Sequence, residues 1–426
     1  MIQTYRILTT ILYPFLFLFL FFRTIIKKED PERFKEKIFI SRFNIKKKDG
    51  SKLVWFHAAS IGEFKSIIPI IEKLNAYKKN FKFLVTTTTL SSGKLASIEL
   101  KNFDNVEHRY LPLDINFLMD KFILLWQPDR IFLVDSEIWP NLILKAKKYN
   151  IPIAIINARI TSKSFNRWMI FPSVAKKIFN TFKFIICSNE KTKKKFEELN
   201  LNNIYFKGNI KLIGNIDEKK IKNVNKELLL NTRFWFAASI HKDEEEFCLK
   251  THLELKKKFS NVLTIIAPRH IDRSKRIVSL SDNLSLSSQI LSEDEVILKG
   301  KEIIIINYFG ALQKYFKYAK STFLGKSIIK KLKNDSGQNP IEAAKLNCKI
   351  YHGPYVSNFE DIYRILNKFK ISKKIENLKE LSDGLAVDLG SIDQRKEILN
   401  PIEHLEQKTL NDTMMLVKNF IDNENY

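Results

Sequence analysis

Two short polar clusters in the first half of the chain combine residue types that can move a proton or stabilise charge. The first, Ser60-Ile-Gly-Glu63, directly follows an apolar run. Ser-x-x-Glu is the pattern of a capping box, in which both side chains satisfy backbone N–H groups at a helix start. The same carboxylate could instead act as a general base for an attacking hydroxyl, with Gly62 allowing a substrate close to the backbone. Spacing alone leaves both interpretations of Glu63 open.

A second cluster places two carboxylates, Asp135 and Glu137, just ahead of Pro140. Acidic residues and proline both favour the first turn of a helix, so this cluster has a structural interpretation as well. Arg159 and Lys211 follow later apolar runs. A guanidinium there can bind a phosphate or carboxylate, or pair with a structural acid, and a lysine supplies a point charge for an anionic substrate.

The second half of the chain repeats this arrangement. Ser239-Ile-His241 is expected to open a helix whose N-terminus can bind phosphate, and Asp243–Glu246 supply the acids of its first turn. Pro268-Arg269 follows another apolar run and offers a guanidinium for a phosphate or a base edge.

The segment Asn339-Pro340-Ile-Glu342 is typical of a helix start, with an N-cap asparagine, a proline at the first position and an acid at the third. Capping explains Glu342 fully. A sugar-nucleotide enzyme could instead use this acid for ribose hydroxyls, as dinucleotide-binding folds do.

All of these clusters follow short apolar runs that alternate with amphipathic segments such as 64–79 and 142–149. Continuous apolar runs are typical of parallel strands buried on both faces, and their alternation with helices predicts an α/β fold. Such sheets bind ligands at the carboxyl ends of their strands. The expected strands are 53–58, 81–86, 130–134, 151–156, 184–187, 234–238, 262–268, 302–307, 321–324 and 349–351.

The strand series restarts after a polar, lysine-rich stretch at 217–228, and the two halves open alike, with WFHAAS and FWFAAS. We therefore expect two doubly wound, Rossmann-like domains facing a central cleft. They are placed at residues 29–216 and 217–395, followed by a helical tail over 396–426.

The N-terminus predicts a membrane anchor over residues 1–28. Residues 7–22 carry no charge, slightly short of the ~20 residues of a spanning helix. Lys27 and Lys28 follow, which places the next domain on the cytoplasmic side. A signal peptide would need a small-residue cleavage site, which FFRTIIKKED does not offer. A buried core helix is the structural alternative.

The composition and the missing motifs exclude several classes of protein and of binding site. The 426 residues carry a net charge of +25, which favours polyanions, although lysine is spread along the whole chain. Nucleic acid is not expected as a partner, because no nucleic-acid motif accompanies the charge. Three scattered cysteines and seven dispersed histidines argue against a disulfide framework and a zinc site. P-loop, dinucleotide, D-x-D and hydrolase-elbow motifs are also missing, so we expect no cofactor and no metal.

Taken in order, the clusters belong to nine short motifs: HAASIGE, YLPLD, SEIWPN, NARITSKS, GNIK, ASIH, APRH, GQNPIEAA and HGPYVSNF. In this order, after an apolar N-terminus, the chain resembles the 3-deoxy-D-manno-oct-2-ulosonic acid (Kdo) transferases of lipopolysaccharide biosynthesis. The resemblance covers roughly residues 30–370.

The resemblance implies a GT-B glycosyltransferase whose first domain binds a lipid acceptor and whose second domain binds a nucleotide. It implies metal-independent, inverting transfer of Kdo from CMP-Kdo to the lipid A precursor, at the cytoplasmic face of the bacterial inner membrane and in contact with its lipids. By motif position, Glu63 matches the general base, and Glu137 and Lys211 match a pair that stabilises the transition state. The expected nucleotide site contains Ser239, His241, Pro268, Arg269, Phe309, Gly310, Ala311, Asn339, Pro340, Ile341 and Glu342. Many GT-B enzymes end on a helix that crosses back to the first domain, which we expect of 396–426.

Three departures from the family pattern lie in the donor half. Ile240 stands in place of a threonine, Ala311 in place of an acid, and Ser336 and Gln338 in place of a glycine and a histidine. They favour weaker donor binding or an altered donor. Two alternatives therefore stay open: a GT-B transferase that uses another sugar nucleotide, and a non-catalytic, membrane-associated binding protein on the same fold.

Overall fold

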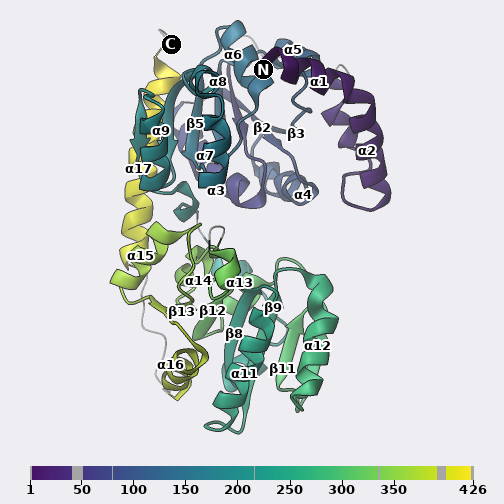
Figure 1. Cartoon of the computed structure of the whole chain (residues 1–426), viewed down its shortest axis with the longest axis vertical. Helices are drawn as coiled ribbons and strands as arrows, with labels where there is room; N and C mark the ends of the chain where they lie inside the picture. The colour runs from purple at the N-terminus through teal and green to yellow at the C-terminus, as the bar shows by residue number, and fades with distance from the viewer. Residues whose placement is uncertain are drawn as a thin grey trace. The chain divides into compact units, whose positions relative to one another are not determined.

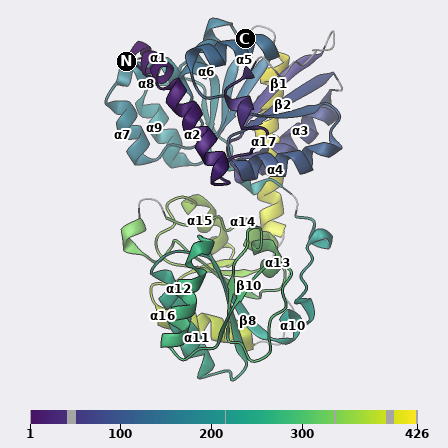
Figure 2. The same cartoon turned by 90° about the vertical axis from the view of Figure 1, so that its right-hand side faces the viewer.

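The computed structural model describes residues 2–40, 51–78, 80–214, 216–333, 336–390 and 400–423. The chain forms two compact units: unit 1 is Met1–Gly214 with Leu405–Tyr426, and unit 2 is Asn215–His404 (Figures 1 and 2). The expected boundary between residues 395 and 396 lies outside the described residues.

Unit 1 is built on a parallel sheet that has, in the described part of the chain, seven strands in the order β3-β2-β1-β4-β5-β6-β7. Its inner strands are apolar and buried on both faces, as the continuous runs predicted. The strands are β1 (Lys52–His57), β2 (Phe81–Thr87), β3 (Val106–Tyr110), β4 (Arg130–Val134), β5 (Ile153–Ala158), β6 (Phe182–Cys187) and β7 (Ile204–Phe206).

Two hydrophobic cores hold helices on the two faces of this sheet. Successive residues of β1 alternate between them: Trp55 packs in one core, and Val54 and Phe56 pack in the other. The first core contains α5 (Asn116–Trp126), α6 (Pro140–Lys148), α8 (Pro172–Phe179) and α9 (Glu190–Glu198). The second contains α3 (Ile61–Tyr77), α4 (Leu90–Glu99) and α17 (Asn400–Asp422).

Unit 2 has a second parallel sheet, with seven described strands in the order β10-β11-β9-β8-β12-β13-β14. The strands are β8 (Arg233–Ile240), β9 (Val262–Pro268), β10 (Ser288–Leu291), β11 (Ile303–Ile306), β12 (Ser321–Leu324), β13 (Lys349–His352) and β14 (Ser372–Lys374). One core joins this sheet to α11 (Glu244–Lys256), α12 (Ser274–Asn283) and α16 (Leu378–Gly390).

The ten strands expected from the sequence are present, with ends shifted by at most two residues. The sequence analysis missed β3, β7, β10 and β14, which are the four edge strands of the two sheets. The side chains of these strands are only partly buried. In β10 every second side chain is buried, and in β7 none is. An edge strand has a neighbour on one side only, so it needs no continuous apolar run.

The single apolar helix expected at the N-terminus is two helices, α1 (Ile2–Ile11) and α2 (Tyr13–Ile25), which are bent by 56°. The bend has a local cause, because Pro14 lies in the first turn of α2, where its missing N–H is tolerated and its ring prevents a continuous helix. Among the described residues, no single helix is long and apolar enough to cross a membrane. The two helices of this bent pair, taken together, have the length and the apolar composition of a membrane span.

The bent pair packs one side on unit 1. The Tyr5 hydroxyl donates to Asp114 Oδ2 at 2.9 Å, and Arg6 Nε donates to Asn141 Oδ1 at 3.2 Å. Leu20 of α2 is buried. The opposite side exposes large apolar side chains to solvent: Ile7, Leu8, Ile11, Phe15, Leu18, Phe19, Phe21, Phe22 and Ile25.

The C-terminal helix α17 packs on unit 1 (Figure 1). Phe420 is buried, with its ring 5.2 Å from that of Phe132 and 5.3 Å from that of Phe184. Arg130 Nε donates to the carbonyl oxygen of Phe420 at 2.9 Å. Residues from Leu405 onward therefore belong to the fold of the first unit rather than to a separate tail.

Candidate active site

Glu63 lies at the carboxyl edge of the first sheet, in the opening turn of α3. A capping box is present, because Ser60 Oγ accepts from the Glu63 N–H and the Glu63 carboxylate accepts from the Ser60 N–H, both at 3.4 Å. The carboxylate makes two shorter bonds: Oε2 accepts from the Ala59 N–H and Oε1 from the Ser60 hydroxyl, each at 2.8 Å. The capping interpretation of Ser60 and Glu63 is therefore confirmed.

Burial raises the pKa of Glu63 above its usual value. The negative charge of Asp135, and to a smaller extent that of Glu137, raises this pKa further. The Ser60 hydroxyl and the positive charge of Lys211 lower it. The other two predicted catalytic residues, Glu137 and Lys211, thus both lie within electrostatic reach of Glu63. A carboxylate with a raised pKa is suited to accept a proton.

Glu137 lies in the loop between β4 and α6 and contacts the ring nitrogens of His57 and Trp139. Its Oε2 is 3.1 Å from His57 Nε2 and accepts from Trp139 Nε1 at 2.8 Å. His57 is the last residue of β1 and is fully buried. The conformation of this loop is therefore stabilised by His57 of the neighbouring strand β1 and by Trp139 of the loop itself.

Lys211 forms its ion pair with Asp135, whose side chain is buried. Glu137, the other residue expected to stabilise the transition state, has a different partner and is held by His57. Asp135 has a left-handed φ of 61° at the end of β4, which turns the chain sharply after the strand.

Asn157 supports Lys211 from the next strand. It is buried at the carboxyl end of β5, also with a left-handed φ, 56°. Its Oδ1 accepts from the Ile210 N–H at 3.0 Å. The GNIK segment that carries Lys211 is therefore fixed to the same edge of the sheet as Asp135 and Glu137. Although several carboxylates gather here, the described residues contain no group of three or more metal-ligating side chains.

In unit 2 the helix start differs from expectation. Ser239 still belongs to β8, in a left-handed conformation, and α11 begins only at Glu244, so Ser239 and His241 do not open the helix. Glu244 is the fully buried centre of this region. Its carboxylate accepts from the N–H groups of His241 (3.0 Å), Lys326 (2.6 Å) and Ser327 (2.9 Å). Burial raises the pKa of this acid, and the backbone bonds oppose the shift.

The remaining predicted residues of unit 2 converge on the same edge of its sheet. The Arg269 N–H donates to the Ile240 carbonyl oxygen at 2.9 Å, which ties the Pro268-Arg269 loop to the end of β8. His241 Nε2 and Gln338 Nε2 are 3.0 Å apart, which ties β8 to the 337–342 loop.

The FGAL and GQNP segments also meet. Gln313, in the short helix after Phe309-Gly310-Ala311, donates to Glu342 Oε1 at 3.0 Å. Asn339 Oδ1 accepts from the Ile341 N–H at 3.0 Å, but the short helix Ile341–Lys345 has Pro340 rather than Asn339 as its N-cap, so the predicted cap is wrong by one position. The Phe309 side chain is 75% exposed, which leaves it free of the core. The predicted nucleotide-binding segments are therefore linked to one another at the carboxyl edge of the sheet of unit 2.

Two of the donor-half departures have structural roles. The Ile240 side chain is fully buried in the core of unit 2, so it does not face a ligand. Ser336 is buried too, and its hydroxyl is 3.1 Å from that of Ser357 and donates to the Lys333 carbonyl oxygen at 3.0 Å.

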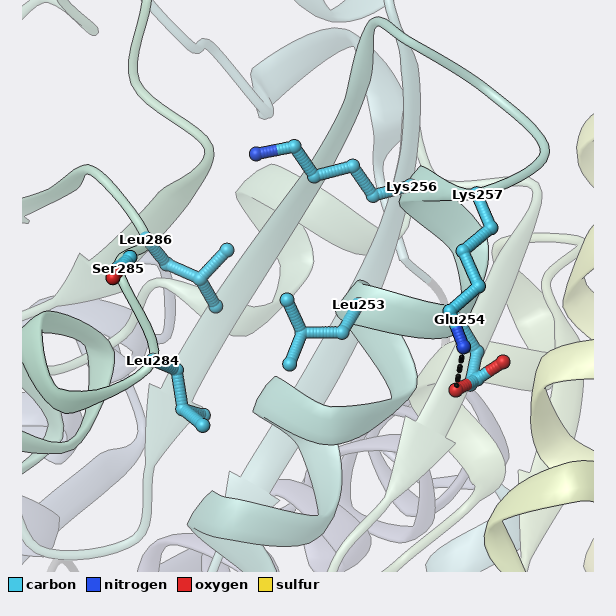
Figure 3. Close-up of a pocket in the computed structure, with 7 residues that line it drawn as sticks. All are labelled: Leu253, Glu254, Lys256, Lys257, Leu284, Ser285 and Leu286. Carbon is cyan, nitrogen blue, oxygen red and sulfur yellow. Dashed lines mark hydrogen bonds and ion pairs between the residues drawn. The ribbon is translucent and has the colours of Figure 1, made fainter.

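Unit 2 carries a surface hollow of about 510 Å³ (Figure 3). It is lined by the C-terminal part of α11 and by the segment that follows α12, including Lys256 and Leu286. In a doubly wound fold the helices end opposite the carboxyl edge of the sheet. The hollow contains none of the predicted site residues.

Sequence reasoning missed two residues that shape the sites. His57 lies inside the quoted HAASIGE motif, and its position at a strand end beside a carboxylate-bearing loop was the available signal. Glu244 was interpreted only as a first-turn acid. Three of its four backbone partners, Lys326, Ser327 and Ile328, come from a segment distant in sequence, so spacing could not identify them.

The two parallel-sheet units, each with polar residues at the carboxyl ends of its strands, define a doubly wound α/β protein of the GT-B type. A glycosyltransferase structure from Rickettsia africae shares this fold, with a TM-score of 0.60, 13% sequence identity, and coverage of 88% of this chain and 100% of that chain.

Sequence comparisons narrow the class to one family. A profile described as 3-deoxy-D-manno-octulosonic-acid transferase (kdotransferase) matches residues 32–213. The 3-deoxy-D-manno-octulosonic acid transferase of Rickettsia conorii is 30% identical over 80% of this chain and 73% of that protein. The transferase of the same name from Rickettsia prowazekii is 28% identical over 99% of this chain and its own full length. The chain belongs to the 3-deoxy-D-manno-octulosonic acid transferase family.

Proposed function

We propose that this protein transfers Kdo from CMP-Kdo to a hydroxyl of the lipid A precursor, with Glu63 as the general base. The observation that carries the proposal is the buried Glu63 carboxylate, whose pKa is raised by burial and by Asp135. It lies at the carboxyl edge of unit 1, within electrostatic reach of Glu137 and Lys211. The alternative reading, a cap alone, needs neither of these two neighbours.

The reaction is a single displacement. The acceptor oxygen forms a bond to the anomeric carbon of Kdo while the bond from that carbon to the phosphate oxygen of CMP breaks. CMP leaves with the electron pair, and the hydroxyl proton passes to Glu63. One displacement inverts the anomeric carbon and needs no covalent intermediate. A sugar hydroxyl is a poor nucleophile until a base takes its proton, so Glu63 lowers the main barrier.

Charge develops on both sides of the breaking bond. Positive charge grows on the anomeric carbon, where the carboxylate of Glu137 favours it. Negative charge grows on the departing phosphate, where Lys211 and Arg269 favour it. Lys211 is preorganised by Asp135 and by the GNIK segment, so little reorganisation is needed at the moment of transfer.

We assign the donor to unit 2, where Arg269 is exposed at a strand end beside His241 and the 337–342 loop. The proposed nucleotide contacts also include Ser239, Phe309–Ala311 and Asn339–Glu342. The scheme uses no cofactor and no metal, because the cations of the chain supply the positive charge at the phosphate.

We further propose that α1 and α2 attach the protein to the cytoplasmic face of the bacterial inner membrane. Their exposed apolar side, together with Arg23, Lys27 and Lys28, suits the boundary between acyl chains and anionic headgroups. Vesicles with phosphatidylglycerol test this attachment. Phe19→Glu, a change at a 55% exposed position, should weaken vesicle binding while the protein stays folded.

The decisive experiment is a transfer assay. Purified protein is mixed with tetraacylated lipid A precursor and CMP-Kdo generated in situ, and the products are read by mass. Kdo-sized additions that disappear in Glu63→Gln support the proposal. No product from folded protein would contradict this donor and acceptor.

A second candidate is transfer from another sugar nucleotide. It is favoured by Ala311 and Gln338, which depart from the family pattern in the nucleotide loops. Competition between CMP and UDP for binding separates the two cases, because a CMP-Kdo enzyme should bind CMP the more tightly. Binding of either without turnover would favour a non-catalytic role.

A further inference from the structure

The His57 ring is held at both nitrogens inside unit 1. Nδ1 is 2.9 Å from the Thr86 hydroxyl and 3.1 Å from the Thr86 carbonyl oxygen, and Nε2 is 3.1 Å from Glu137 Oε2. The side chain is fully buried. The ring therefore has no freedom to rotate without losing a bond to β2 or to the Glu137 loop.

The acceptor at Glu137 indicates which ring nitrogen carries a proton. An ionised carboxylate oxygen can only accept, so the bond to Glu137 Oε2 requires a proton on His57 Nε2. Trp55 Nε1 donates to Thr86 Oγ1 at 2.8 Å, and the Thr86 hydroxyl can donate its own proton to His57 Nδ1. With the protons placed in this way, the hydrogen bonds run in one direction, from Trp55 through Thr86 and His57 to Glu137.

Both ring donors reach the same oxygen of Glu137. His57 Nε2 and Trp139 Nε1 bind Oε2, and within the described residues no hydrogen bond is made to Oε1. The Glu137 side chain is 16% exposed. Two donors on one oxygen fix the plane of the carboxylate and leave the other oxygen for a ligand.

We propose that His57 is a positioning residue for Kdo transfer, which holds Glu137 so that Oε1 faces the reacting sugar. This inference rests on the role given to Glu137 in the proposed function. Thr86 and Trp55 in turn hold the His57 ring, so the orientation of a residue at the site is set by the interior of the sheet. His57 itself does not contact the substrate.

Two substitutions of His57 separate its two bonds. Glutamine places an amide N–H near the former Nε2, so His57→Gln keeps a donor for Glu137. Asparagine places its amide near the former Nδ1, so His57→Asn keeps a partner for Thr86 and loses the donor for Glu137. We expect His57→Asn to lower kcat about 100-fold, the size of effect that a misplaced reacting group produces. His57→Gln should recover most of the loss, and the KM for CMP-Kdo should change little in both.

A double-mutant cycle with Glu137→Gln tests whether His57 acts through Glu137. Once Glu137 is replaced, His57→Asn should lower the rate no further, because the two changes remove one function. Thermal unfolding checks that each variant is folded. If His57→Asn does not fold, Trp139→Phe removes the other donor to Oε2 and must show the same non-additivity.

The outcomes are distinguishable. Equal losses in His57→Asn and His57→Gln, or effects that multiply with Glu137→Gln, would overturn the positioning role while Kdo transfer stands. A Glu137→Gln variant at the full rate would overturn the role of Glu137 and this inference together. Failure of the unaltered protein to transfer Kdo would overturn the proposed function itself.

Discussion

Replacing Glu63 by glutamine separates the two functions that the Ser60–Glu63 pair can have. Glutamine keeps the size of the side chain and one oxygen that can accept from the Ala59 N–H, which is now 2.8 Å from the carboxylate. It removes the charge and the ability to take a proton. A residue that only caps α3 should therefore lose a little stability, whereas a general base should lose its rate.

The two effects differ in size. Loss of a helix cap costs about 0.5–2 kcal/mol of unfolding free energy. Loss of general base catalysis lowers a rate about 10²–10⁴-fold, which corresponds to about 2.7–5.4 kcal/mol of activation free energy. The stability cost should also depend on pH. Because the pKa of Glu63 is raised in the folded state, the wild type loses stability as pH rises through that pKa, and glutamine does not. The stability difference between the two proteins should thus shrink toward alkaline pH.

Ser60→Ala is the matched control. It removes the hydroxyl that donates to Glu63 Oε1 and caps the helix, but it leaves the carboxylate in place. We expect a stability loss of about 1 kcal/mol. Since the Ser60 hydroxyl lowers the pKa of Glu63, its removal should raise that pKa and move the acid limb of kcat/KM to higher pH. The plateau at alkaline pH should remain near that of the wild type.

The assay measures kcat/KM for Kdo transfer across pH, with thermal unfolding of the same samples. A Glu63→Gln variant within threefold of the wild-type rate would show that Glu63 is only a cap. A Ser60→Ala variant that is as inactive as Glu63→Gln at every pH would show that the helix cap, rather than the charge, limits the reaction.

Three further predictions concern other parts of the chain. Asp135→Asn removes a negative charge that raises the pKa of Glu63, so the acid limb of kcat/KM should move to lower pH; an unchanged or opposite limb would refute the electrostatic coupling. Phe420→Ala leaves a cavity beneath α17 and should cost about 3–5 kcal/mol in chemical denaturation, whereas Met415→Ala, at a 54% exposed position of the same helix, should have little effect. Equal losses would mean that α17 does not stabilise unit 1. Arg269→Ala should weaken CMP binding about 10–100-fold in calorimetry, as expected for a lost charge-assisted hydrogen bond, and an unchanged affinity would remove Arg269 from the donor site.

Local sequence located part of the candidate site. Glu63 was identified by its type and by its position after the apolar run of β1, and Lys211 by the GNIK motif, and the sheet does bring the carboxyl ends of its strands to one edge. Their partners were not identified. The pairing of Lys211 with Asp135 joins residues 76 positions apart, and that of His57 with Glu137 joins residues 80 apart. Such pairs depend on strand order, which no short motif encodes.

The features that depend on local burial and backbone chemistry were predictable from short stretches of sequence. Inner strands need apolar side chains on both faces, so continuous apolar runs in the sequence predicted their positions. Ser60 and Glu63 predicted the start of α3. Other features depend on contacts between residues that are far apart in the sequence, so they became visible only in the folded structure. The edge strands are strands because each forms backbone hydrogen bonds with one neighbouring strand. Ile240 was directed into the core by the bulge in β8 at Ser239. The last helix packs on unit 1 because Phe420 contacts the apolar face formed by Phe132 and its neighbours. Phe132 and Phe420 are almost 290 residues apart in the sequence.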